Sequence, residues 1–211
     1  MKYRAIIAIV VTFLATEINA ASFDCKKAKS ELEHTICDHP KLSQLDTELG
    51  TIYQNLLQKL VKSEVERLRQ RQRRWLESRQ NNCDVKNPDC LVTLYQQRVT
   101  TLEFRSSANY ATSPAGKVDG KYITDNIELE VEALASNMAF VHIAGAEPQS
   151  GRWTCDFSGE GKLQGNLLKI KALDDAFVTV TFHGSTATVN EGETSLWCGM
   201  GGSLNGKYLK K

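Results

Sequence analysis

The sequence predicts an α+β protein with two domains: a disulfide-stapled antiparallel bundle of about four helices, followed by a small antiparallel β-barrel or sandwich. Between Phe23 and Arg105 the apolar residues recur with a helical period, and Gly50 is the only glycine. After Ser106 the pattern changes to short segments in which apolar and polar residues alternate. Six cysteines are spread over both parts, which is typical of a protein that folds in an oxidising compartment.

The first 21 residues have the three parts of a secretory signal. Lys2 and Arg4 supply a basic start, an apolar stretch covers residues 5–15, and Ile18-Asn19-Ala20 ends in the small residue that a cleavage site needs. So short an apolar stretch does not span a membrane. We therefore expect cleavage after Ala20 or Ala21, a periplasmic or secreted protein, and no membrane span after cleavage.

The even number of cysteines in the exported part favours three disulfides. We expect the pairs Cys25–Cys37, Cys83–Cys90 and Cys155–Cys198. Cys25 should lie just before the first helix, because twelve residues of intact helix would hold Cys25 and Cys37 about 18 Å apart. Zinc is the alternative, but the sequence has no Cys-x-x-Cys, and only His34 and His39 lie close to a cysteine. We expect no metal and no other cofactor.

Residues 22–105 are predicted to form the helical domain. The four helices are expected near Ala28–Cys37, from after Ser43 to Lys62, over Ser63–Asn81, and from about Asp89 to Arg105. A break at Lys62 and Ser63 is favoured, because an uninterrupted helix from Ser43 to Asn81 would be about 55 Å long with no helix of similar length to pack against. Ser63 and Glu66 have the capping-box spacing that starts a new helix. We therefore expect the chain to fold back at Ser63.

Polar residues share the apolar stripe of the third helix, where Gln72 and Arg79 accompany Trp75. Half-buried polar groups need specific partners. A fold-back at Ser63 would bring Asp46 and Arg79 to the same level, so we expect an ion pair between them with Trp75 packed in the same layer. The favoured interpretation is a structural network of interior polar side chains, made of Asp46, Gln72, Arg79 and Arg98.

Three arginines of the same helix, Arg67, Arg71 and Arg74, lie off this stripe and are expected to face water. Such a row is most often a solvated helix face. Residues 22–110 contain 15 Lys and Arg against 12 Asp and Glu, and residues 111–211 contain 9 against 12. This difference of +3 and −3 is too small to indicate binding to nucleic acid.

A small, polar linker is predicted over residues 106–116, and the β domain over residues 117–211. Eight or nine short strands are expected, including Ile127–Leu134, Ala139–Ile143, Arg152–Phe157, Leu167–Lys171, Phe177–Phe182, Thr186–Val189 and Ser195–Cys198. The first and last segments of this domain, Val118–Tyr122 and Leu204–Tyr208, have similar sequences. If these two segments pair, the sheet closes on itself and has no exposed edges.

The sequence contains no recognisable catalytic motif. The four histidines stand apart, and none belongs to a Gly-x-Ser-x-Gly or His-Glu-x-x-His arrangement. Asp156 and Glu160 could be posed as the two carboxylates of a glycosidase, but two acids near a glycine turn are too common to indicate that chemistry. We expect that the protein is not an enzyme.

An ordered set of residues that includes four cysteines runs through the helical half. It consists of Phe23, Asp24, Cys25, Ala28, Glu33, Ile36, Cys37, Pro40, Leu45, Asp46, Leu49, Tyr53, Leu68, Arg69, Gln72, Arg73, Trp75, Leu76, Arg79, Cys83, Cys90, Leu91, Tyr95, Arg98 and Leu102. With this set the helical half resembles the N-terminal domain of the LprI family, exported bacterial proteins named for a lysozyme inhibitor. The β half looks like a domain often found behind this one in uncharacterised proteins, marked by Cys155–Gly159, Cys198–Ser203 and Gly206–Tyr208.

The resemblance implies a periplasmic protein that binds lysozyme and occludes it, with Arg67, Arg71 and Arg74 as the candidate contacts. The alternative is an envelope adaptor or ligand-binding protein that has no inhibitory activity and whose barrel binds a small or glycan ligand. No feature of the sequence selects an oligomeric state.

Overall fold

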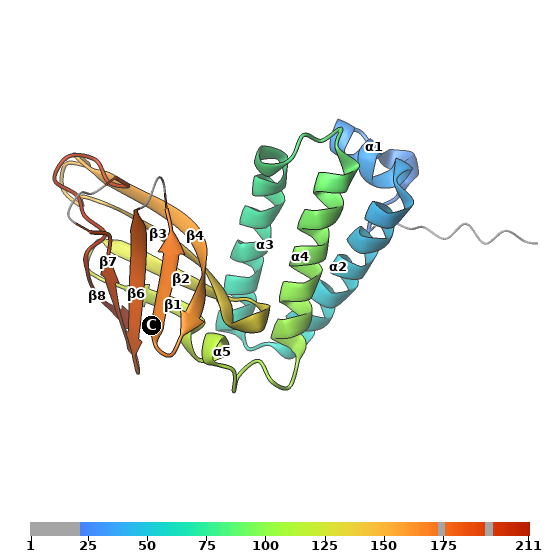
Figure 1. Cartoon of the computed structure of the whole chain (residues 1–211). Helices are drawn as coiled ribbons and strands as arrows, with labels where there is room; N and C mark the ends of the chain where they lie inside the picture. Colours follow the sequence, from blue (N-terminus) through green and yellow to red (C-terminus); the bar gives the residue numbers. More distant parts are fainter. Residues whose placement is uncertain (1–21, 173–175, 193–195) are drawn as a thin grey trace, which may run out of the picture.

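The computed structural model describes residues 22–172, 176–192 and 196–211. It contains a helical domain followed by an eight-stranded antiparallel barrel, which lie side by side (Figure 1). The predicted fold class is therefore confirmed, and of the two β architectures the barrel is present. The predicted signal segment, residues 1–21, lies outside the described residues.

The helical domain begins with a short 3-10 turn and contains four helices. Their bounds are Cys25–Lys27 for the 3-10 turn, then α1 Glu31–Asp38, α2 Pro40–Lys59, α3 Lys62–Asn82 and α4 Pro88–Ser106. A capping box formed by Ser30 and Glu33 starts α1. Prolines occupy the first position of α2 and of α4, where the missing N–H costs no hydrogen bond.

The capping box predicted at Ser63 and Glu66 is wrong. Helix α3 begins at Lys62, and its N-cap Val61 makes no side-chain capping bond. The fold-back uses only two extended residues, Leu60 and Val61. Because the connection is this short, Ser63 already lies inside the first turn of the helix.

Helix α4 lies between α2 and α3, so the two arms of the predicted hairpin are not direct neighbours over most of their length (Figure 1). The apolar core is built mainly along α2 and α4, and α3 is the helix nearest the barrel. The fully buried side chains of this core include Leu42, Leu45, Leu68, Leu91, Tyr95 and Leu102. Tyr95 therefore stands where the sequence interpretation had placed a contact between α2 and α3.

The expected ion pair between Asp46 and Arg79 is replaced by a bridge through Tyr95. Arg79 donates from Nη1 to the Tyr95 hydroxyl, which donates to Asp46 Oδ1 at 3.1 Å. Asp46 Oδ2 accepts two further bonds from Ser22, at 2.7 Å from its main-chain nitrogen and 2.5 Å from its hydroxyl. Burial raises the pKa of Tyr95 well above its ordinary value, so the hydroxyl keeps its proton. Trp75 packs edge-on against Tyr95 with 5.0 Å between ring centroids.

All six cysteines form disulfides, and the three pairs match the sequence prediction. Cys25–Cys37 ties the 3-10 turn to the end of α1, with 5.8 Å between Cα atoms. Cys83–Cys90 closes the turn between α3 and α4, also with 5.8 Å between Cα atoms. Cys155–Cys198 lies in the barrel, with 4.0 Å between Cα atoms.

The strands form one closed barrel in sequence order. Their bounds are β1 Gly120–Ile123, β2 Ile127–Ala133, β3 Met138–Ala146, β4 Thr154–Gln164, β5 Leu167–Lys171, β6 Phe177–His183, β7 Thr186–Asn190 and β8 Gly206–Lys210. The first and last strands pair through Tyr122 with Lys210 and Ile123 with Leu209, so the predicted closure is confirmed. The strand expected over Ser195–Cys198 is wrong for its described residues, because Cys198 makes only an isolated bridge to Cys155.

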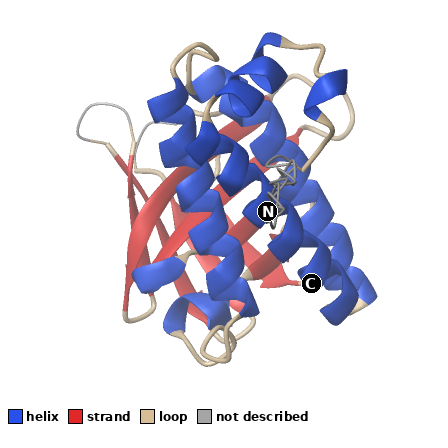
Figure 2. Cartoon of the chain, turned by 90° about the vertical axis from the view of Figure 1, so that its right-hand side faces the viewer, coloured by secondary structure: helices blue, strands red, loops and turns tan. Residues whose placement is uncertain are grey.

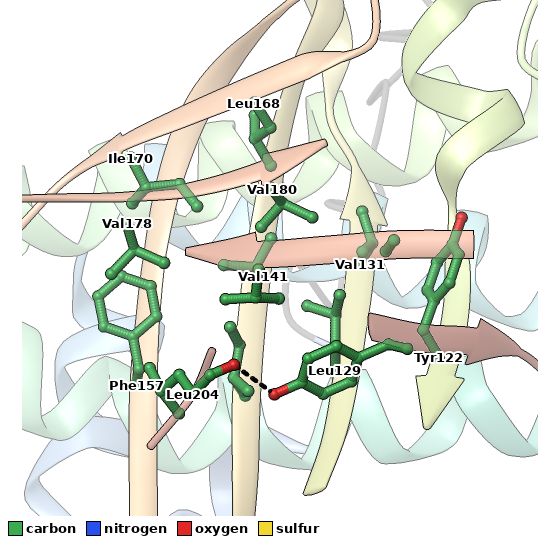
Figure 3. Close-up of a cluster of buried hydrophobic side chains, with 14 of the residues drawn as sticks. Tyr122, Leu129, Val131, Val141, Phe157, Leu168, Ile170, Val178, Val180 and Leu204 are labelled. Atoms are coloured by element: carbon green, nitrogen blue, oxygen red, sulfur yellow. Dashed lines mark hydrogen bonds between the residues drawn. The ribbon is translucent and has the colours of Figure 1, made fainter. Parts of the chain in front are cut away.

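Alternate residues of the strands fill the barrel interior with apolar side chains (Figure 3). They include Leu129, Val131, Val141, Ile143, Phe157, Leu168, Ile170, Val178 and Val180. Two buried tyrosines reach main-chain carbonyl oxygens, Tyr122 that of Val118 at 2.9 Å and Tyr208 that of Leu204 at 2.8 Å. The described interior is thus a packed apolar core, and the polar residues that alternate with it along the strands face outward.

The segment between the domains holds a short helix, α5, over Pro114–Val118. Ser113 caps it by accepting a hydrogen bond from the Gly116 main-chain nitrogen at 2.9 Å. A Cβ atom at Gly116 would lie 1.8 Å from the Tyr110 carbonyl oxygen, so only glycine fits this close approach. Residues that read as a polar linker therefore form a folded corner.

We predict that Asp46→Ala lowers the free energy of unfolding by about 3 kcal/mol, because it removes a buried charged acceptor from Tyr95 and Ser22. Urea denaturation of the chain from residue 22 onward measures this. Glu103→Ala is the control, since it removes an exposed carboxylate from α4 and should change the value by no more than about 0.5 kcal/mol. Equal effects of the two substitutions would contradict the structural role of Asp46.

Candidate functional site at the domain interface

Helices α3 and α4 cover the outer face of strand β2, since each donates a side-chain hydrogen bond to a glutamate of that strand. The rotated view shows helices in front of the sheet (Figure 2). The strand alternation turns Leu129 and Val131 into the barrel and turns Glu130 and Glu132 outward. An outward glutamate of a small barrel normally meets water, yet Glu130 is only 2% exposed. The carboxylates that are buried in this interface therefore need cationic partners.

Arg71 of α3 is the centre of this interface. Its Nε donates to Glu130 Oε1 at 2.7 Å, and its Nη1 donates to Asp119 Oδ2 at 2.9 Å. Its Nη2 donates to the Val131 carbonyl oxygen at 2.6 Å and to Asp119 Oδ1 at 3.3 Å. Asp119 directly precedes β1, and Glu130 and Val131 belong to β2, so one guanidinium joins the helical domain to the barrel. This bidentate geometry is the strong form of an arginine–carboxylate pair.

The expectation that Arg67, Arg71 and Arg74 form a row facing water is wrong for Arg71, which is 2% exposed. Arg74 is only partly exposed and donates to Glu130 Oε2. Arg67 is also partly covered and lies 3.7 Å from Glu64. The row lies off the apolar stripe of the bundle as predicted, but the barrel covers it. The arginines of α3 that do reach water include Arg69 and Arg73.

Helix α4 adds two more buried arginines. Arg98 donates from Nε to Gln72 Oε1 at 3.0 Å and from Nη1 to Glu132 Oε1 at 2.9 Å. Arg105 donates from Nη1 to the Tyr110 hydroxyl at 2.5 Å and, more weakly, to Asp119 Oδ1 at 3.5 Å. Gln72 and Arg98 are thus bonded to each other, but their acid comes from the barrel rather than from α2.

The electrostatics of the layer favour the charged forms of Asp119 and Glu130. Burial alone would raise the pKa of Asp119, but Arg71 and Arg105 lower it to about 2. Burial also opposes ionisation of Glu130, and the adjacent Arg71 and Arg74 nevertheless lower its pKa. The pKa of Arg71 is raised by the carboxylates around it in spite of its burial. Arg71, Asp119 and Glu130 are therefore fixed charges at neutral pH.

A cleft of about 380 Å³ opens beside this layer, between α3, α4 and the outer face of the barrel. Aromatic, basic and acidic side chains share its walls, among them Trp75, Arg98, Phe140, His142, Ser158 and Glu160. Arg98 Nη2 is buried and has no hydrogen-bond partner among the described residues. Burial and the nearby Glu132 carboxylate raise the pKa of Glu160. These groups can bind a small polar molecule through hydrogen bonds and ring contacts.

The pair of acids considered for glycosidase chemistry does not come together. Asp156 and Glu160 are four residues apart on β4, which separates their Cα atoms by about 13 Å. Glu160 lines the cleft, and Asp156 does not. Asp156 instead lies 3.4 Å from His142 on the neighbouring strand. Within the described residues, no three His, Cys, Asp or Glu side chains gather in a way that could hold a metal ion.

The fold and its interface define a class of protein: a disulfide-stapled helical domain fixed to a closed antiparallel barrel by a layer of buried arginine–carboxylate pairs. Residues 25–102, which make up most of the helical domain, match the family described as Lysozyme inhibitor LprI. This match agrees with the resemblance seen in the sequence, and it does not extend into the barrel. No curated protein and no solved structure matches the chain. Among the described helices, none is both long enough and apolar enough to cross a membrane.

Sequence reasoning missed four residues of the interface: Arg105, Asp119, Glu130 and Glu132. One signal could have found two of them. Glu130 and Glu132 are acids on the outward side of a strand whose inward side is wholly apolar, and the helical half offers arginines spaced along one face of α3. Asp119, which precedes the first strand, carries no such periodic signal.

We predict that Arg71→Ala lowers the free energy of unfolding by about 3–5 kcal/mol, because it leaves Asp119 and Glu130 without their main cationic partner in a buried site. Arg73→Ala on the same helix is the matched control. The Arg73 side chain is 64% exposed, so its loss should cost at most about 0.5 kcal/mol. Chemical denaturation of both variants decides the matter, and a cost below 1 kcal/mol for Arg71→Ala would show that the pairs do not hold the domains together.

We also predict a loss of stability in acid. Asp119 has a folded-state pKa of about 2, below its ordinary value of 3.8, so its contribution is complete above about pH 4 and disappears as the pH falls towards 2. The shift corresponds to about 2 kcal/mol, and Glu130 acts in the same direction. Asp119→Asn should be less stable at pH 7 and should show a smaller further loss between pH 4 and pH 2. Identical acid dependence in the two proteins would exclude this role for Asp119.

Proposed function

We propose that the protein is an exported lysozyme inhibitor that binds lysozyme and occludes its cleft without chemistry of its own. The observation that carries this proposal is the family match over residues 25–102, which covers nearly the whole helical domain. Three disulfides, two of them in that domain, support folding outside the cytoplasm in the periplasm or beyond. Lysozyme cleaves its substrate with two carboxylates that are held in different protonation states in a cleft. A protein that blocks this cleft sterically therefore stops the reaction.

The buried interface limits which surface can act. Arg71 bonds to the barrel and is not available to a partner, so the row of Arg67, Arg71 and Arg74 does not serve as the inhibitory surface. An isolated helical half would expose this row, and an isolated barrel would leave Asp119 and Glu130 unpaired. The functional unit in this proposal is therefore the whole exported chain.

The same interface changes the charge that a partner meets. Arg71, Arg98 and Arg105 pair with Asp119, Glu130 and Glu132 inside the protein. With these six residues set aside, each half has as many basic as acidic residues, 12 of each in the helical half and 9 of each in the barrel half. Attraction to a cationic lysozyme thus has to come from local groups of acids rather than from the net charge of one half.

Ligand binding is the second candidate function, and the cleft between the domains favours it. The barrel is expected to bind a small or glycan ligand, but its interior is filled by apolar side chains, so a small polar ligand such as a glycan fragment would occupy the cleft lined by Trp75 and Glu160. Calorimetric titration with short glycans tests this. Ser158→Trp should block binding from the cleft wall, whereas Thr188→Trp on the exposed side of β7 should not.

We predict that the chain from residue 22 onward inhibits lysis of a bacterial suspension by at least one lysozyme type at micromolar concentration and low salt. Inhibition should disappear after reduction and alkylation of the disulfides, because the helical domain depends on two of them. Turbidity measurements with several lysozyme types provide the readout. Absence of inhibition of every type would exclude this function and leave the ligand-binding or adaptor protein.

A further inference from the structure

The connection between β7 and β8 presents a large apolar side chain to water at its tip. Met200 is 95% exposed, and Leu196 in the same connection is 58% exposed. This connection lies at the end of the barrel opposite α5 (Figure 1). Large apolar side chains exposed together on a soluble protein commonly mark a binding surface.

The turn that carries Met200 is tied to strand β4 on one side. The Cys155–Cys198 disulfide anchors its start. Main-chain bonds extend the anchor, since Asp156 N donates to the Trp197 carbonyl oxygen at 2.9 Å and Gly199 N donates to that of Thr154 at 2.8 Å. Met200 thus directly follows Gly199, whose main-chain nitrogen makes one of these hydrogen bonds.

Glycines let the turn pack directly on Trp153. A Cβ atom at Gly202 would lie 2.9 Å from Trp153 Cδ2, and one at Gly199 would lie 3.3 Å from Trp153 Cα. The Gly202 main-chain nitrogen donates to the Gly199 carbonyl oxygen at 2.9 Å and closes the turn around Met200. Met200 is therefore exposed because the turn that carries it is closed by this hydrogen bond and packs against the Trp153 ring.

The far side of the turn is anchored as well. Ser203 donates from its hydroxyl to Glu191 Oε1 at 2.6 Å, and Leu204 N donates to the same oxygen at 2.8 Å. Trp197 stacks on Phe157, with ring planes 7° apart and centroids 5.4 Å apart. A turn held at both ends is pre-organised, and binding through it requires little loss of conformational entropy.

Acidic residues lie at the same end of the barrel as this apolar tip. Asp125 in the β1–β2 connection and Glu147 in the β3–β4 connection lie at the same end of the barrel, and Asp156 is bonded directly to the turn through its main chain. Arg152 is the basic residue of the β3–β4 connection. An apolar tip at a barrel end that carries these acids fits a cationic protein better than an anionic membrane surface.

We propose that the turn over residues 196–203, with Met200 at its tip, is the element that enters the cleft of a cationic lysozyme. This inference rests on the proposed inhibitory function and names its contact surface. Met200 supplies the desolvated apolar anchor, and its unbranched thioether adapts to the walls of a cleft. Asp125, Glu147 and Asp156 accelerate the encounter and set its salt dependence.

The test compares Met200→Glu with Val61→Glu in the chain from residue 22 onward. Both positions are exposed apolar residues, Met200 at 95% and Val61 at 64%, so both variants should fold. Glutamate adds negative charge, which would favour a cationic partner, so weaker inhibition by Met200→Glu cannot result from repulsion. We expect the inhibition constant of Met200→Glu to rise at least tenfold, that of Val61→Glu to stay within twofold, and Met200→Leu to inhibit like the unmodified protein.

Other results would overturn the proposal in distinguishable ways. Unchanged inhibition by Met200→Glu would remove the turn from the contact and leave the inhibitory function in place. No inhibition by the unmodified protein would exclude the function and the turn's role together. Co-sedimentation with phosphatidylglycerol–phosphatidylethanolamine vesicles that Met200→Glu abolishes, without any inhibition, would instead assign the turn to a membrane surface.

Discussion

The buried guanidinium of Arg71 is the contact on which the arrangement of this protein depends. A charge taken out of water is costly unless each of its donors finds a partner, and here Nε, Nη1 and Nη2 all do. Those partners come from Asp119, Glu130 and the Val131 carbonyl, so satisfying the arginine also fixes the barrel against α3. A bidentate pair accepts little rotation. The helical domain and the barrel therefore act as one body rather than as two linked modules.

Features set by local periodicity could be predicted from the sequence. The four helices, most of the strands and the closure of the sheet depend on patterns within a few residues, because side chains repeat every 3.6 positions in a helix and every two in a strand. The disulfides followed from the same patterns, since Cys83 and Cys90 flank a turn and Cys25 cannot reach Cys37 from inside a continuous helix. The capping box at Ser63 failed because a capping pattern shows where a helix can start, whereas two residues of fold-back determined where it does start.

Contacts between elements far apart in the chain could not be predicted this way. The helical period shows that Arg71 does not point into the core of its own bundle. The sequence pattern is the same whether that face of the helix meets water or a second domain. The ion pair predicted between Asp46 and Arg79 places them at equal distances from the fold-back, and it assumes that α2 and α3 are in contact. Helix α4 lies between them, and the hydroxyl of Tyr95 carries the interaction that the ion pair was expected to make. In both cases the missing information was the identity of the neighbouring element.

The interface also explains why the family match and the contact surface can lie in different domains. In the helical domain alone, the face of α3 that carries Arg71 would be open to partners. Here the barrel occupies that face and pairs its charges, so the lysozyme-binding surface that we propose has to lie elsewhere on the protein. The turn around Met200 meets that need, because disulfide, glycine and indole contacts hold it in place and Asp125, Glu147 and Asp156 lie at the same end of the barrel. The rigidity that removes one binding surface is what lets a distant turn present another in a fixed position.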